Sequence, residues 1–216
     1  MMKVTLVSIA MFLALVGCVN MPAKAVENNS AEPEYQQVYR SAYMALQDNN
    51  WPLYKNLLRK VIDTSTRDGA PVNERAIFWY EYGRALGITC EWKQAEFALA
   101  VAHNLDLKTG GPVHKTLNEL GRVNGLIKQY EKAVRYFTRG AKALAQYQEQ
   151  YPTAEINLAG RAQILTDFAD ALEQRGGQPS DIQRLRDDAV AARKKSIEKG
   201  ETYADITPYG TQCAAR

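Results

Sequence analysis

Residues 76–107 read AIFWYEYGRALGITCEWKQAEFALAVAHNLDL, and this stretch decides the fold of the chain. Its first half places four residues on one face of an α-helix: Trp79, Tyr82, Gly83 and Leu86. Its second half does the same with four more: Trp92, Ala95, Leu99 and Ala102. Small residues let two backbones approach while large side chains fill the space around them. The stretch therefore predicts an antiparallel helix pair with its turn at residues 87–91.

The same pattern returns further along the chain. The sequence distance from Gly83 to Gly121 equals the distance from Ala95 to Ala133. Two independent pairs of residues therefore give the same repeat period. The order W-x2-Y-G-x2-L, followed by small and apolar residues in the second helix, resembles a tetratricopeptide (TPR) repeat, a helix pair of about 34 residues. The connection between the two units is therefore expected to be about four residues longer than usual, and residues 108–112 (KTGGP) provide it.

This resemblance implies an all-α fold, a TPR-like α-solenoid of antiparallel helix pairs over residues 35–200. Besides the two clear units, we expect four more helices, over residues 35–48, 51–64, 156–175 and 180–199. The last of them is expected to begin with a capping box at Ser180–Gln183. The final pair is interpreted as a degenerate repeat or a solvating cap. Residues 201–216 are predicted to form a polar C-terminal tail without periodicity.

Residues 1–17 do not belong to this fold. Lys3 precedes an apolar run over residues 4–16, which has the length of a signal peptide and is too short to span a bilayer comfortably. The run ends Leu-Val-Gly-Cys at Cys18 and resembles the bacterial lipobox, so Cys18 is expected to be lipidated. The alternative is an ordinary cleaved signal with an incidental cysteine. Residues 18–34 are polar and contain prolines, which predicts a flexible tether.

The lipobox resemblance also implies a location. Val19 stands where enterobacterial lipoproteins retained in the inner membrane carry aspartate. We therefore expect the protein to be lipid-anchored in the outer membrane and to face the periplasm, since several acyl chains give durable anchoring. In that oxidising compartment the two remaining cysteines, Cys90 and Cys213, suggest a disulfide. The alternative is a buried Cys90 and a free Cys213.

The sequence contains no motif that points to catalysis. The two histidines, His103 and His114, are expected to have surface or capping roles, and there is no phosphate-binding loop, nucleophile elbow or dinucleotide fingerprint. We therefore predict no enzyme, no cofactor and no metal site. One of the 27 Lys and Arg residues lies within residues 1–17, which leaves 26 basic against 24 acidic residues. This balance gives no support to nucleic-acid binding.

In TPR proteins the first helices of successive units line a concave groove that holds an extended peptide or a helix of a partner. The resemblance therefore implies six partner-binding residues: Tyr39, Tyr43, Tyr80, Arg84, Asn118 and Arg122. Aromatic and arginine side chains are enriched at protein interfaces. The two arginines either present guanidinium groups to a partner or pair with neighbouring acids such as Glu81 and Glu119. If they are surface residues, replacing both is expected to leave the fold nearly intact.

Two functions of different kinds fit these observations. The first is a membrane-anchored periplasmic TPR lipoprotein that binds a protein or peptide of the cell envelope as an adaptor or assembly factor. The second is a protective or inhibitory binder, such as an immunity protein against a toxin delivered to the periplasm. Both functions need a protein-binding groove, and neither needs a catalytic site.

Overall fold

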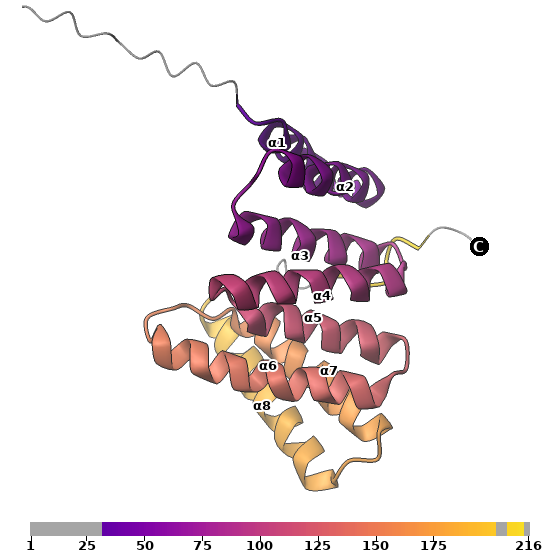
Figure 1. Cartoon of the computed structure of the whole chain (residues 1–216). Coiled ribbons are helices and arrows are strands. Elements are labelled where there is room, and N and C mark those ends of the chain that lie inside the picture. The colour runs from indigo at the N-terminus through magenta and orange to yellow at the C-terminus, as the bar shows by residue number, and fades with distance from the viewer. Residues whose placement is uncertain (1–31, 202–206, 214–216) are drawn as a thin grey trace, which may run out of the picture. The chain divides into compact units, whose positions relative to one another are not determined.

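The computed structural model describes residues 32–201 and 207–213 of the chain. Within these residues there are eight α-helices and no strand (Figure 1). The helices are α1 (Glu34–Gln47), α2 (Trp51–Arg67), α3 (Val72–Ile88), α4 (Trp92–Thr109), α5 (Val113–Leu126), α6 (Tyr130–Gln150), α7 (Leu158–Gln174) and α8 (Pro179–Glu198). The prediction of an all-α fold is confirmed.

The helices of the described part of the chain pack in sequence order, each against the next (Figure 1). The most extensive contacts join α1 with α2, α3 with α4, α5 with α6 and α7 with α8, so the structural unit is the helix pair. In addition, α5 contacts both α3 and α7. The first helices of three successive pairs therefore lie next to one another, and together they form the face that carries the candidate site.

Each helix pair is closed by a turn in which one residue has a positive φ: Asn49 (53°), Cys90 (68°), Lys128 (63°) and Gly176 (81°). This left-handed conformation costs a residue with a Cβ about 1–2 kcal/mol. It reverses the chain within a few residues, which the close packing of the two helices requires. Lys128 follows Cys90 at the same spacing at which Gly121 follows Gly83, so the repeat in the sequence is also a repeat in backbone conformation.

The glycines of the repeat mark close contacts between paired helices. A Cβ on Gly83 would lie 2.7 Å from Cγ of Leu99, and a Cβ on Gly121 would lie 2.7 Å from Cδ1 of Phe137. Leu99 and Phe137 are almost completely buried. Each glycine therefore gives the backbone of the first helix room to touch a large side chain of the second helix. The predicted alternation of small and large residues is confirmed.

Two boundaries differ from the sequence-based expectations. Glu34, predicted as the end of the tether, opens α1 and forms an ion pair of 2.7 Å with Arg67. The capping box predicted at Ser180 is wrong, because α8 begins one residue earlier, at Pro179. Proline suits this first helical position, since its φ is already helical and it has no N–H that needs a partner. Gln178 takes the N-cap position and makes no side-chain capping bond.

The predicted signal peptide (residues 1–17), the lipidated Cys18 and the tether up to residue 31 lie outside the described residues. These features stay predictions, as does any structure for residues 202–206 and 214–216 of the tail. None of the described helices has the length and the apolar character that a membrane-spanning helix needs.

Both histidines pack against other residues. His103 is only 7% exposed, so the surface role expected for it is wrong. Nη2 of Arg139 donates to Nε2 of His103 at 3.1 Å, and Nδ1 of His103 lies 3.4 Å from Oγ1 of Thr116. Because arginine can only donate, the ring of His103 is neutral here. The ring of His114 lies 5.0 Å from that of Tyr147. Burial, aided by the positive charge of Lys115, lowers the pKa of His114 from 6.5 to about 4.

We expect His114 to contribute a decrease of about 1 kcal/mol to the free energy of unfolding between pH 7 and pH 5, after allowance for solvent screening. The pKa of His114 is lower in the folded than in the unfolded chain, so unfolding takes up protons in this range and stability falls as the pH falls. Urea unfolding at both pH values measures the difference. His114→Gln should reduce it, and equal differences in wild type and variant would contradict this assignment.

Candidate functional site

Residues 207–213 of the C-terminal tail lie against the C-terminal end of α3. The N–H of Gly210 donates to the carbonyl of Gly87 at 3.2 Å, and the N–H of Gln212 donates to the carbonyl of Ile88 at 3.0 Å. Gly87 and Ile88 are the last two residues of α3, and carbonyls at this end of a helix have no N–H partner within the helix. The tail, which the sequence predicts to be polar and aperiodic, thus supplies a donor to each of them.

A disulfide joins Cys213 of this segment to Cys90 in the turn between α3 and α4. The two Cα atoms are 5.2 Å apart, within the range usual for disulfides, and 123 residues separate the cysteines in sequence. These are the two cysteines that the sequence analysis pairs. Because Cys90 closely follows the end of α3, the covalent bond holds the segment at the first helices of the repeats.

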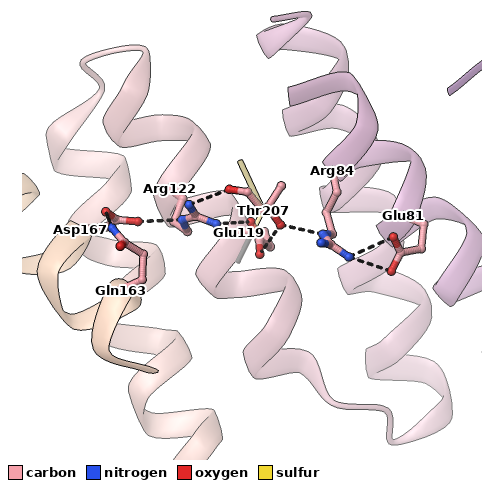
Figure 2. A network of polar contacts seen from close by, with 7 residues as sticks. All are labelled: Glu81, Arg84, Glu119, Arg122, Gln163, Asp167 and Thr207. Atoms are coloured by element: carbon pink, nitrogen blue, oxygen red, sulfur yellow. Dashed lines mark hydrogen bonds and ion pairs between the residues drawn. The ribbon is translucent and has the colours of Figure 1, made fainter. Parts of the chain in front are cut away.

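Arg84 on α3 contacts the segment through a buried hydroxyl group (Figure 2). Its Nε donates to Oγ1 of Thr207 at 2.6 Å, and its Nη1 donates to the two carboxylate oxygens of Glu81 at 3.1 and 3.0 Å. Oγ1 of Thr207 in turn donates to Oε1 of Glu119 on α5 at 3.2 Å. Thr207 is 1% exposed, so its buried hydroxyl is paired with one donor and one acceptor from two different helices.

Arg122 on α5 holds the same residue from the other side (Figure 2). Its Nη2 donates to the backbone carbonyl of Thr207 at 3.0 Å, and its Nη1 to Oε2 of Glu119 at 3.3 Å. Its Nε donates to Oδ2 of Asp167 on α7 at 2.7 Å, and Gln163 Nε2 donates to the other oxygen of this carboxylate at 2.7 Å. The side chain of Arg122 is 9% exposed. Of the two alternatives left open by the sequence, the structure shows the second: both arginines pair with neighbouring acids.

The aromatic ring of Tyr209 completes the contact. The guanidinium carbon of Arg122 lies 4.9 Å from the centre of this ring, and the ring of Trp92 meets it edge-on at 6.4 Å. A Cβ on Gly87 would overlap the Tyr209 ring, so α3 can accept the ring only because residue 87 is glycine. The hydroxyl oxygen of Tyr209 is buried.

The segment itself forms a tight turn rather than an extended strand. The N–H of Tyr209 donates to the carbonyl of Thr207 at 2.9 Å, which closes a γ-turn around Pro208. Gly210 follows with a φ of 75°, a conformation that glycine adopts without strain. The sequence Thr-Pro-Tyr-Gly thus directs both the hydroxyl and the ring toward the helices.

Burial and charge act against each other at this site. Burial raises the pKa of Tyr209 well above its ordinary value; the carboxylate of Glu119 adds to this effect and Arg122 opposes it. Burial also raises the pKa of Asp167, although its ion pair with Arg122 acts in the opposite direction. For Arg84, burial lowers the pKa but the neighbouring carboxylates outweigh it, so the pKa lies above its ordinary value. The guanidinium groups therefore stay charged at every physiological pH.

The six predicted partner-binding residues do not form one surface. Three of them surround the C-terminal segment, since Tyr80 lies under Arg84 at 5.7 Å and both arginines contact Thr207. Tyr39 packs against Phe78 in the core, with 5.0 Å between ring centres. Tyr43 is 53% exposed.

The side chain of Asn118 points toward the second helix of its own pair. Its Oδ1 occupies the place that a Cβ on Gly140 would take, so the side chain is directed at the partner helix α6. In the preceding unit, the position equivalent to Gly140 holds Ala102. Because Gly140 replaces this alanine, there is space on α6 that the side chain of Asn118 fills. The TPR register does not predict that Asn118 turns toward α6.

Several residues that shape the site were not predicted from the sequence: Gly87, Glu119 as a ligand of Thr207, Asp167, Thr207 and Tyr209. One signal was available, because pairing Cys90 with Cys213 places the tail at the end of α3 and hence beside Arg84. Among the described residues, no three His, Cys, Asp or Glu side chains come together in a way that could hold a metal ion.

No protein-family model matches the chain, and no curated protein matches its sequence. Solved structures do resemble its fold. BtubC from P. vanneervenii superposes with a TM-score of 0.63 at 13% identity, over 88% of this chain and 73% of that one. The kinesin light chain TPR-like repeats of Podosopora anserina superpose with a TM-score of 0.54 at 18% identity, over 75% of this chain and 76% of that one. A second structure of the same repeats gives 0.57 over 80% and 81%. The chain therefore has a TPR-like helical repeat fold.

Proposed function

We propose that this protein is a lipid-anchored envelope protein whose TPR-like domain binds a protein partner, as an adaptor or assembly factor and without catalysis of its own. The observation that carries the proposal is the peptide segment seated on the first helices. Thr207 is bound there by the two arginines, and a backbone N–H of the segment binds the end of α3. A face that holds one peptide through side-chain and backbone hydrogen bonds has the chemistry to hold another.

The anchoring part of the proposal rests on the N-terminal sequence, where an apolar run leads directly into Gly17 and Cys18. We expect Cys18→Ser to abolish incorporation of a fatty-acid analogue in metabolic labelling, and to block processing of the signal peptide at this site. Cys90→Ser provides a matched control, because it removes a cysteine without touching the lipobox. Equal labelling of wild type and Cys18→Ser would refute lipidation at this residue.

Partner binding is tested by photo-crosslinking in intact cells with the full-length protein. We expect a crosslinking residue at Tyr43 or Ile77, which are 53% and 50% exposed on first helices, to capture one and the same envelope protein. Val190 on α8 is 70% exposed and serves as the control position that should capture nothing specific. Capture from Val190 alone would place the binding surface on the last helix instead.

A further inference from the structure

The C-terminal segment contacts its site as a ligand contacts a receptor. Thr207 is separated by 123 residues from Arg84 and by 88 from Glu119, and it reaches both through side-chain groups that the helices provide. Helices α3 and α5 contribute a donor and an acceptor for one hydroxyl, a guanidinium over one ring, and a glycine beneath that ring. These features favour a bound segment that has a hydroxyl at the place of Thr207 and an aromatic ring at the place of Tyr209.

The helices do not depend on the segment for their own charge pairing. Without Thr207, Arg84 keeps its ion pair with Glu81, and Arg122 keeps its ion pairs with Glu119 and Asp167. No buried charge is therefore left unpaired when the segment leaves, which is the condition that makes removal of a polar group costly. Most of the segment is already at the surface, since Pro208, Gly210, Thr211, Gln212 and Cys213 are all exposed.

From these contacts we infer that residues 207–213 are an internal ligand that closes the peptide groove, and that the Cys90–Cys213 disulfide keeps them there. A partner with a Ser/Thr-Pro-aromatic-Gly turn takes the same site once the disulfide is opened. This inference rests on the proposed function, because it names the kind of partner that the groove binds. The hydroxyl pairs with Arg84 and Glu119, the ring lies under Arg122, and proline and glycine shape the turn.

Opening the groove is a thiol–disulfide exchange with a dithiol reductant. A thiolate of the reductant attacks the Sγ of Cys213, an exposed residue, and the sulfur of Cys90 leaves as a thiolate that takes up a proton. The second thiol of the reductant, once deprotonated, displaces the sulfur of Cys213, which is also protonated. The reductant ends as a disulfide and both cysteines end as thiols, so two electrons pass from the reductant to the protein.

The test measures binding of a fluorescent peptide TPYGTQ, the sequence of residues 207–212, to the detergent-solubilised full chain. We expect the reduced protein to bind the peptide at least tenfold more tightly than the oxidised protein, as measured by fluorescence anisotropy. Tyr209→Ala weakens the internal ligand and should tighten peptide binding further under reducing conditions. Adding Gly87→Ala to this variant should abolish binding, because the new Cβ fills the place of the tyrosine ring. A peptide with alanine in place of tyrosine should not bind.

Hydrogen exchange provides a second measurement that requires no substitution. On reduction, the amides of Gly210 and Gln212 should lose protection while those of α3 and α5 keep it. Retained protection of both tail amides, or unfolding of α3 and α5 on reduction, would overturn the inference, and so would a folded, reduced protein that binds no peptide. Such a failure leaves the proposed function intact if a crosslinked partner is still captured from Tyr43. Peptide binding without any captured partner would count against the envelope-adaptor role instead.

Discussion

Replacing Arg122 with alanine is expected to lower the free energy of unfolding by about 3–5 kcal/mol. The guanidinium is almost completely buried, and it neutralises Glu119 on its own helix and Asp167 on α7. Removing it leaves two carboxylates close together with no cation between them, while the carbonyl of Thr207 loses a donor. The penalty therefore comes mainly from the charges that remain, and it should couple α5 to α7 and to the C-terminal segment.

Arg135→Ala is the matched control for this prediction. Arg135 lies on α6 and is exposed, so the same substitution should change stability by no more than about 0.5 kcal/mol. Urea unfolding followed by circular dichroism compares the two variants. If Arg122→Ala proved as stable as Arg135→Ala, the buried network around Arg122 would not contribute to the stability of the fold.

Phe137→Ala is expected to destabilise the protein by about 3–5 kcal/mol, through lost burial and the cavity left behind. Phe137 is 1% exposed, lies against Gly121, and stacks on Phe168 of α7 at 5.4 Å between ring centres. It thus contributes both to the packing within its own helix pair and to the contact with the next pair. Leu99 occupies the equivalent place in the preceding unit.

Phe97→Ala tests whether burial, rather than loss of a phenyl ring as such, determines this cost. Phe97 on α4 is 64% exposed and meets the ring of Trp79 edge-on at 6.1 Å. Its truncation should cost about 1 kcal/mol or less. Thermal melts of the two variants should therefore differ by several degrees. Similar melting temperatures would show that the core contact with Gly121 is less tight than the structure indicates.

The helix pairs were predictable because their contacts follow from short-range sequence spacing. Gly83 with Leu99, and Gly121 with Phe137, meet within one hairpin, and the second hairpin repeats the arrangement of the first at a constant offset in the sequence. The helical period and the turn residues sufficed to find both units. Exact ends were less predictable, as Pro179 shows, because a proline at the first helical turn competed with a plausible capping sequence.

The site was predictable only in part, for a physical reason. The contacts of Thr207 with Arg122 and Arg84 join residues 85 and 123 positions apart, and they depend on single side chains rather than on a periodic pattern. The TPR register correctly placed Arg84 and Arg122 on first helices, but it did not predict that the C-terminal segment covers them. Asn118 and Tyr39 show the same limit. Each packs against a particular neighbour, Gly140 and Phe78, and a repeat consensus does not specify such neighbours.

The bond between Cys90 and Cys213 also decides how the molecule responds to mechanical load. It closes a covalent ring that contains α4 to α8. A tension applied between residue 32 and residue 213 passes from Cys90 directly into Cys213, so the helices inside the ring bear no load. Under such a pull α1, α2 and α3 would unravel first, and extension would stop when they are drawn out. The oxidised protein therefore combines an extensible N-terminal part with an inextensible C-terminal part, and reduction of one bond turns the whole chain into a compliant element.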